Sequence, residues 1–261
     1  MAESSPALWT DLRRFTPARV ALGRAGNGLP TGAHLQFQVA HAAARDAVHA
    51  VLDVPALLAS LSTHGIAAQT VTSACPDRQT YLRRPDLGRT LNLADRARLA
   101  VIPAPGSMVF VVCDGLSALA VQRHAATLLA QVIPALAPLW AGPVVIATQG
   151  RVALGDDIGA AMQASAVAVL IGERPGLSSP DSLGVYLTWN PRPGRADSER
   201  NCISNIRPEG LPVAQAAVKL LWLIGAMCQL RLTGINLKDE QPLLAGQSRT
   251  LPAPSGDGHN S

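Results

Sequence analysis

The chain contains little lysine and few aromatic residues, and both shortages limit the partners that it could bind. Of the 22 basic residues only two, Lys219 and Lys238, are lysines, and the others are arginines. Nine of the 261 residues are aromatic. The formal net charge is +4, but the arginines are interspersed with acidic residues and form no basic run. Without clustered positive charge and aromatic stacking platforms, we expect no nucleic-acid partner.

Motifs of self-contained catalytic sites are missing as well. The sequence has no Gly-x-x-x-x-Gly-Lys-Ser/Thr phosphate loop and no Gly-x-Ser-x-Gly nucleophile elbow. Its four cysteines form no Cys-x-x-Cys pair, and its six histidines form no cluster with metal-ligand spacing. We therefore predict reduced thiols, no metal site and no catalytic residue within this chain.

Long apolar runs and a secretory signal are also missing. No uninterrupted apolar run reaches the roughly 18 residues that span a bilayer. The N-terminus does not join a basic start to an apolar stretch. We expect no membrane partner and a soluble, cytoplasmic protein. The composition, 48% hydrophobic and 15% charged, is instead typical of a globular chain with a substantial core.

Hydrophobic periodicity predicts two structured parts and a tail. Residues 1–104 are expected to be mainly helical, with helices over 34–52 and 54–61 and an arginine-rich loop over 77–88. Residues 105–237 alternate short apolar runs with helices, which indicates an α/β domain with a mainly parallel sheet. The expected strands cover 108–113, 144–148, 166–171 and 185–189, and the expected helices cover 117–134, 156–163 and 213–232. Residues 238–261 are polar and rich in Pro, Gly and Ser, so we predict a disordered tail.

Three of the expected strands are followed by polar and glycine residues. In an open α/β sheet, ligands gather at the carboxyl ends of the strands, so these segments could line one crevice. They are Asp114-Gly115-Leu116-Ser117, Gln149-Gly150-Arg151-Val152 and Gly172-Glu173-Arg174-Pro175-Gly176.

Each of these residues also has a simpler interpretation. Asp114 and Ser117 could serve only as turn and N-cap residues. Glu173 could be a solvated loop acid, and a lone Cys202 is usually a small buried hydrophobic residue. The glycines at Gly23–Gly28 follow no expected strand, so they do not meet the context of a dinucleotide-binding fingerprint.

Taken in order, several segments resemble the small subunit of ethanolamine ammonia-lyase. The resemblance extends over about residues 12–236, nearly the whole predicted fold, and the order and spacing of its segments make it very specific. The segments are 12–20 continuing into 23–26, then 81–89, 114–117, 150–152, 157–159, 172–177 and 202–206.

The resemblance implies a subunit of an adenosylcobalamin-dependent enzyme that converts ethanolamine to acetaldehyde and ammonia. It implies that a large subunit, a TIM barrel, carries the substrate site and the catalytic groups, in a hetero-oligomer of large–small pairs. For the small subunit it implies a helical region followed by a Rossmann-like α/β domain that helps to hold cobalamin. The positions that match the family's cobalamin contacts are Val152, Glu173 and Cys202.

Two features refine this expectation. The sequence has no Asp-x-His-x-x-Gly motif, which agrees with a family whose cofactor keeps its own dimethylbenzimidazole on cobalt. Family members that enter bacterial microcompartments often carry an N-terminal extension, whereas about eleven residues precede the resembling region here. We therefore expect a cytosolic complex. A bacterial microcompartment stays open, because the large subunit could carry its own targeting signal.

Two other functions stay open at this point. One is a Rossmann-like oxidoreductase with a nicotinamide cofactor, although the turn at Asp114-Gly115 lacks the required glycine pattern. The other is a structural assembly subunit that has lost its cofactor role.

Overall fold

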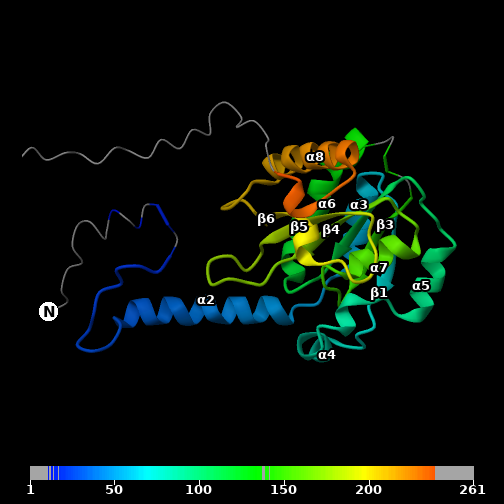
Figure 1. Ribbon diagram of the computed structural model, residues 1–261. Helices are drawn as coiled ribbons and strands as arrows, with labels where there is room; N and C mark the ends of the chain where they lie inside the picture. Colours follow the sequence, from blue (N-terminus) through cyan, green and yellow to red (C-terminus); the bar gives the residue numbers. More distant parts are fainter. Residues whose placement is uncertain are drawn as a thin grey trace, which may run out of the picture.

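The fold is built around a six-stranded mixed sheet with helices on both faces (Figure 1). A computed structural model describes residues 11, 13, 15–16, 18–136, 139–140 and 142–238. Strands β1, β3, β2 and β4 are parallel, and β5 and β6 each run antiparallel to the preceding strand in the order β1-β3-β2-β4-β5-β6. The strands are β1 (Ala68–Thr72), β2 (Met108–Cys113), β3 (Val144–Thr148), β4 (Ala166–Gly172), β5 (Leu183–Trp189) and β6 (Asn201–Ile206).

Alternate residues of the central strand β2 pack on opposite faces of the sheet. Phe110 and Val112 belong to the core beneath α3 (Val54–Thr63), α6 (Ala118–Val132) and α8 (Val213–Leu230). Val109 and Val111 belong to the core beneath α5 (Leu93–Ala100) and α7 (Leu154–Ala161). Because helices cover both faces of the sheet, the central strands are continuous apolar runs in the sequence. This is why the sequence predicts these strands.

Two further helices lie at one end of this three-layered body. The long helix α2 (Thr31–His49) runs outward from it, and α4 (Arg78–Arg83) lies near the end at which α2 joins it (Figure 1). Asp77 caps α4 by accepting a hydrogen bond from the Thr80 amide at 2.8 Å. Short 3-10 turns complete the described structure at Leu87–Arg89, Ile133–Leu136, Asp197–Glu199 and Gly234–Asn236.

The α/β class, the mainly parallel sheet and the four predicted strands are confirmed. Two strands are additions: β1 lies within the region expected to be mainly helical, and β6 was not expected as a strand. The arginine-rich segment, expected to be a loop, contains α4. The strand order and the antiparallel β5 differ from the doubly wound order 3-2-1-4-5-6, so the Rossmann-like label is not confirmed.

The predicted domain limits at residues 104 and 237 stay predictions. β1 nevertheless belongs to the same sheet as the strands of the second part, since it pairs with β3. The predicted tail lies outside the described residues from position 239 onward. Positions 12, 14 and 17 of the first resembling segment also lie outside them.

One helix of the described chain, α8, has the length and composition of a membrane span. Its 18 residues have a mean hydropathy of 1.5. This is weak evidence for a membrane, because core helices share these properties. α8 buries one side, including Leu220, Ile224 and Met227, in the core that it forms with α6 and the sheet.

Candidate functional site

A cavity of about 400 Å³ lies where β2, β3 and β4 end. All three strand-end segments singled out from the sequence contribute to it, so the expectation of one shared crevice is confirmed. Val152 and Glu173 both line it. The complete lining is Tyr81, Gly115, Leu116, Arg151, Val152, Ile171, Gly172, Glu173, Arg174 and Tyr186.

Two glycines that line this cavity let the ends of β2 and β4 pack closely. Gly115 adopts φ +55°, in the left-handed region that side chains disfavour. Gly172 lies very close to the turn after β2. A Cβ added to it would lie 2.6 Å from the Ser117 carbonyl carbon and 2.7 Å from the Asp114 carbonyl oxygen. The Leu116 amide donates to the Gly172 carbonyl at 2.9 Å and fixes the contact. The ends of β2 and β4 are therefore in direct backbone contact.

Asp114 holds the ends of β2 and β3 together. Its buried carboxylate accepts hydrogen bonds from the amides of Gln149 at 2.9 Å and Gly150 at 3.2 Å. Burial raises the pKa of Asp114, and these backbone donors oppose that shift. Asp114 does not line the cavity, so its role is to shape the two turns that do.

Ser117 acts as the N-cap of α6, as its simpler interpretation predicted. Its hydroxyl accepts from the Ala120 amide at 3.2 Å and donates to the Pro180 carbonyl at 2.7 Å. The second bond ties the β4–β5 loop to the start of α6. This loop begins with Glu173, so the cap also supports one wall of the cavity.

Tyr81 forms a wall of the cavity that sequence reasoning had not assigned to it. The buried ring contacts two guanidinium groups, with its centroid 4.7 Å from that of Arg78 and 4.2 Å from that of Arg151. Its hydroxyl donates to the Gly150 carbonyl at 3.1 Å. Burial raises the pKa of Tyr81, so the phenol stays protonated and keeps this bond. Only its place in the resembling segment 81–89 could have pointed to this residue.

Glu173 is held in place at the junction of β4 and β5. Its Oε2 accepts hydrogen bonds from the Ser182 hydroxyl and, at 3.1 Å, from the Asn205 amide. A Cβ at position 184 would lie 3.0 Å from Glu173 Oε1, so Gly184 leaves room for the carboxylate. Glu173 is therefore a half-buried loop acid whose position is set by two donors.

Cys202 lies beside the cavity and does not line it. It stands on β6 opposite Tyr186 of β5, and Tyr186 is a lining residue. The residue is exposed, so its interpretation as a buried hydrophobic residue is wrong. Desolvation nonetheless raises the pKa of the Cys202 thiol, as it raises that of Tyr186. Both groups are neutral near pH 7, which makes Cys202 a poor nucleophile.

The residues on the described part of the chain provide no metal site. No group of three or more His, Cys, Asp or Glu side chains is placed to hold an ion there. The glycine segment Gly23–Gly28 closes a small turn, with mutual hydrogen bonds between Ala25 and Gly28, and precedes α2. Among the described residues no strand precedes it, and it does not line the cavity.

Comparison with known proteins identifies the family. Residues 6–238 match the family model described as ethanolamine ammonia-lyase light chain (EutC). The chain belongs to this family.

Curated relatives are similar to this chain over most of its length. The ethanolamine ammonia-lyase small subunit of Xanthomonas campestris pv. campestris is 53% identical, covering 94% of this chain and 93% of the relative. The small subunit of Azotobacter vinelandii is 52% identical, covering 99% and 98%. That of Bradyrhizobium diazoefficiens is 54% identical, covering 88% and 90%. Membership of this lyase family speaks against a nicotinamide oxidoreductase, and a small subunit implies a large-subunit partner.

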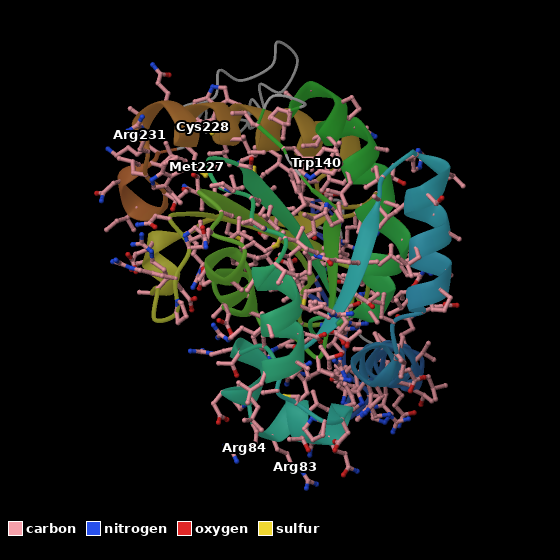
Figure 2. All side chains as sticks on the ribbon, turned by 90° about the vertical axis from the view of Figure 1, so that its right-hand side faces the viewer. Arg83, Arg84, Trp140, Met227, Cys228 and Arg231 are labelled. Atoms are coloured by element: carbon pink, nitrogen blue, oxygen red, sulfur yellow. The ribbon has the colours of Figure 1, made fainter. Side chains whose placement is uncertain are left out.

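A second cavity of this small-subunit chain lies at the opposite end of the sheet. Its volume is about 410 Å³, and its lining includes Met108 at the start of β2 together with Cys228 and Arg231. Figure 2 shows Cys228 and Arg231 at the end of the molecule opposite Arg83 and Arg84. None of Val152, Glu173 and Cys202 lines this second cavity. The candidate site of this chain is therefore the first cavity.

Proposed function

We propose that this chain and a large subunit together bind adenosylcobalamin at the first cavity and convert ethanolamine to acetaldehyde and ammonia. The observation that best supports the proposal is the convergence of Val152 and Glu173 on one cavity, with Cys202 beside its Tyr186 wall. When bound, the cofactor supplies the radical chemistry through homolysis of its cobalt–carbon bond. The substrate site and the catalytic groups belong to the large subunit in this proposal.

The side chains around the cavity suit the edge of such a cofactor. A corrin is a flat apolar ring fringed with carboxamide arms, so it requires apolar surface beside hydrogen-bonding groups. Leu116, Val152 and Ile171 provide apolar surface. Glu173 is an acceptor for amide N–H groups, and its Ser182 and Asn205 bonds both go to Oε2. The cavity is too small to enclose a whole cobalamin, so this chain would cover one part and the large subunit the rest.

The roles of this chain's residues are to bind, to orient and to exclude water. Glu173 is oriented by its two donors, and the neutral Cys202 and Tyr186 add no charge beside the ring. Close backbone contact at Gly115 and Gly172 packs the ends of β2 and β4 tightly, which would help this chain to exclude water from the site. None of these residues performs a catalytic step, so we expect the isolated chain to release no ammonia.

Replacing Glu173 with Gln tests the site directly. Gln keeps the size of the side chain but removes the charge that strengthens its hydrogen bonds. Because a hydrogen bond to a charged group contributes about 1.5–3 kcal/mol, we expect the Kd for adenosylcobalamin to rise at least about tenfold. The measurement is a titration of the co-purified two-chain complex with adenosylcobalamin, followed by visible absorbance, beside an assay of ammonia release.

The matched control is Glu209→Gln, which changes a glutamate that does not line the cavity, is 71% exposed at the side chain and lies 3.5 Å from Arg207. It should leave both measurements unchanged. An unchanged Kd in Glu173→Gln would refute the assigned site. A complex that assembles without binding cobalamin, or an isolated chain that releases ammonia, would refute the proposed function.

A further inference from the structure

Helix α2 leaves most of its length without a partner in the described chain. Figure 1 shows it running outward from the body, and its buried residues, Ala44 and Ala47, lie near its C-terminal end. Three large apolar side chains of its first half are exposed: Leu35 by 54%, Phe37 by 39% and Val39 by 71%. At 1.5 Å per residue, the whole helix is about 28 Å long.

The exposed part of α2 lacks the charged residues of a typical solvated helix. Residues 31–44 contain no Asp, Glu, Lys or Arg, and Arg45 is the first charged residue of the helix. Surface helices normally place charged side chains on the face that meets water. Exposed apolar surface without such charges marks a site of protein contact. The partner surface should therefore be apolar and should need no ion pairs.

The base of α2 is fastened to the candidate site. Arg78 donates from Nε at 2.9 Å and from Nη2 at 2.7 Å to the carbonyl of Val48, in the last turn of α2. Its Nη1 donates at 2.8 Å to the carbonyl of Gly115, which lines the cavity. A protein that covers the cavity would therefore lie next to the base of α2.

We propose that residues 31–43 of α2 are a docking element for the large subunit. The proposal builds on the proposed function, which places the large subunit over the cavity, and family membership supplies that partner. A second copy of this chain suits α2 less well. The stripe of Leu35 and Val39 continues to Ala42 and then to Asp46, which is too short for the three or more heptads typical of a coiled coil.

Placing negative charge on α2 tests this docking role. We expect the double variant Leu35→Glu/Val39→Glu to lose the large subunit during co-purification, with a Kd between the chains at least about tenfold higher. Both side chains are exposed, so thermal unfolding of the isolated small chain should not change. The control is Leu93→Glu on α5, which alters a side chain that is 84% exposed on the other side of the molecule (Figure 1).

The outcomes separate this proposal from the proposed function, because assembly is measured without cofactor. An unchanged Kd between the chains in the double variant would overturn the docking role, as would wild-type chains that do not associate. A wild-type small chain that is dimeric in sedimentation, and monomeric only in the double variant, would assign α2 to a second copy. A complex that depends on α2 yet binds no cobalamin would refute the proposed function alone.

Discussion

Gly172→Ala is expected to lower the free energy of unfolding by about 3 kcal/mol, at the upper end of the range for overpacking, and to weaken cofactor binding. The added Cβ would overlap the carbonyl group of Ser117 and lie 2.7 Å from the Asp114 oxygen. These are backbone atoms, so no side chain can rotate away. Relief requires the end of β4 to separate from the turn after β2, and that turn supplies Gly115 and Leu116 to the cavity. Urea unfolding and the adenosylcobalamin titration of the complex measure the two effects.

The control is the same substitution at Gly225, for which we expect the free energy of unfolding to rise instead of fall. Gly225 lies within α8, and a Cβ there would meet nothing within 4 Å. Alanine removes the conformational freedom of glycine within a helix, so Gly225→Ala should stabilise the chain by about 0.5–1 kcal/mol. If Gly172→Ala leaves the urea midpoint unchanged, the close contact between β2 and β4 is not present in solution.

Asp156→Asn is expected to destabilise the chain by about 3–5 kcal/mol, because it removes the buried carboxylate that neutralises a buried arginine. Asp156 and Arg200 are each 1% exposed at the side chain, and two bonds of 2.6 Å join them. Arg200 also donates to the Thr188 hydroxyl at 2.9 Å and to the Arg195 carbonyl at 3.0 Å. Its second carboxylate partner, Asp197 at 3.4 Å, is 89% exposed at the side chain and therefore contributes less than the buried Asp156. Cys202 follows Arg200 by two residues, so loosening this pair should also disturb the β6 side of the site.

An exposed pair with the same separation serves as the control. Arg84 and Asp86 also lie 2.6 Å apart, but their side chains are 59% and 58% exposed. Asp86→Asn should therefore cost no more than about 1 kcal/mol. Chemical denaturation of both variants measures the difference. Equal losses would mean that burial does not set the contribution of the Asp156–Arg200 pair.

The sequence could predict the centre of the sheet but not its edges. β2 and β4 are buried on both faces, and an unbroken apolar run reports that directly. β1 and β6 are edge strands with polar residues such as Gln69 and Asn201, so their sequences carry no such run. Their place in the sheet depends on pairing with distant segments, which a local pattern does not contain.

The candidate site was predictable to a similar extent. Strand-end topology alone brought Val152 and Glu173 together, since both follow predicted strands. The position of Cys202 depends on the pairing of β6 with β5. The role of Tyr81 as a wall of the cavity depends on its contacts with Gly150 and Arg151, which lie about 70 residues further along the chain. Family resemblance supplied Cys202 but gave Tyr81 no role.

The exposure of Cys202 gives this chain a built-in position for a reporter group. Cys75 and Cys113 are buried and Cys228 is half-buried, while Cys202 is exposed beside the Tyr186 wall of the cavity. A thiol-reactive dye should therefore modify Cys202 first, at a slow rate because the thiol is neutral. The native sequence thus offers a labelling position next to the candidate site, and protection of that thiol can be followed as the site is covered.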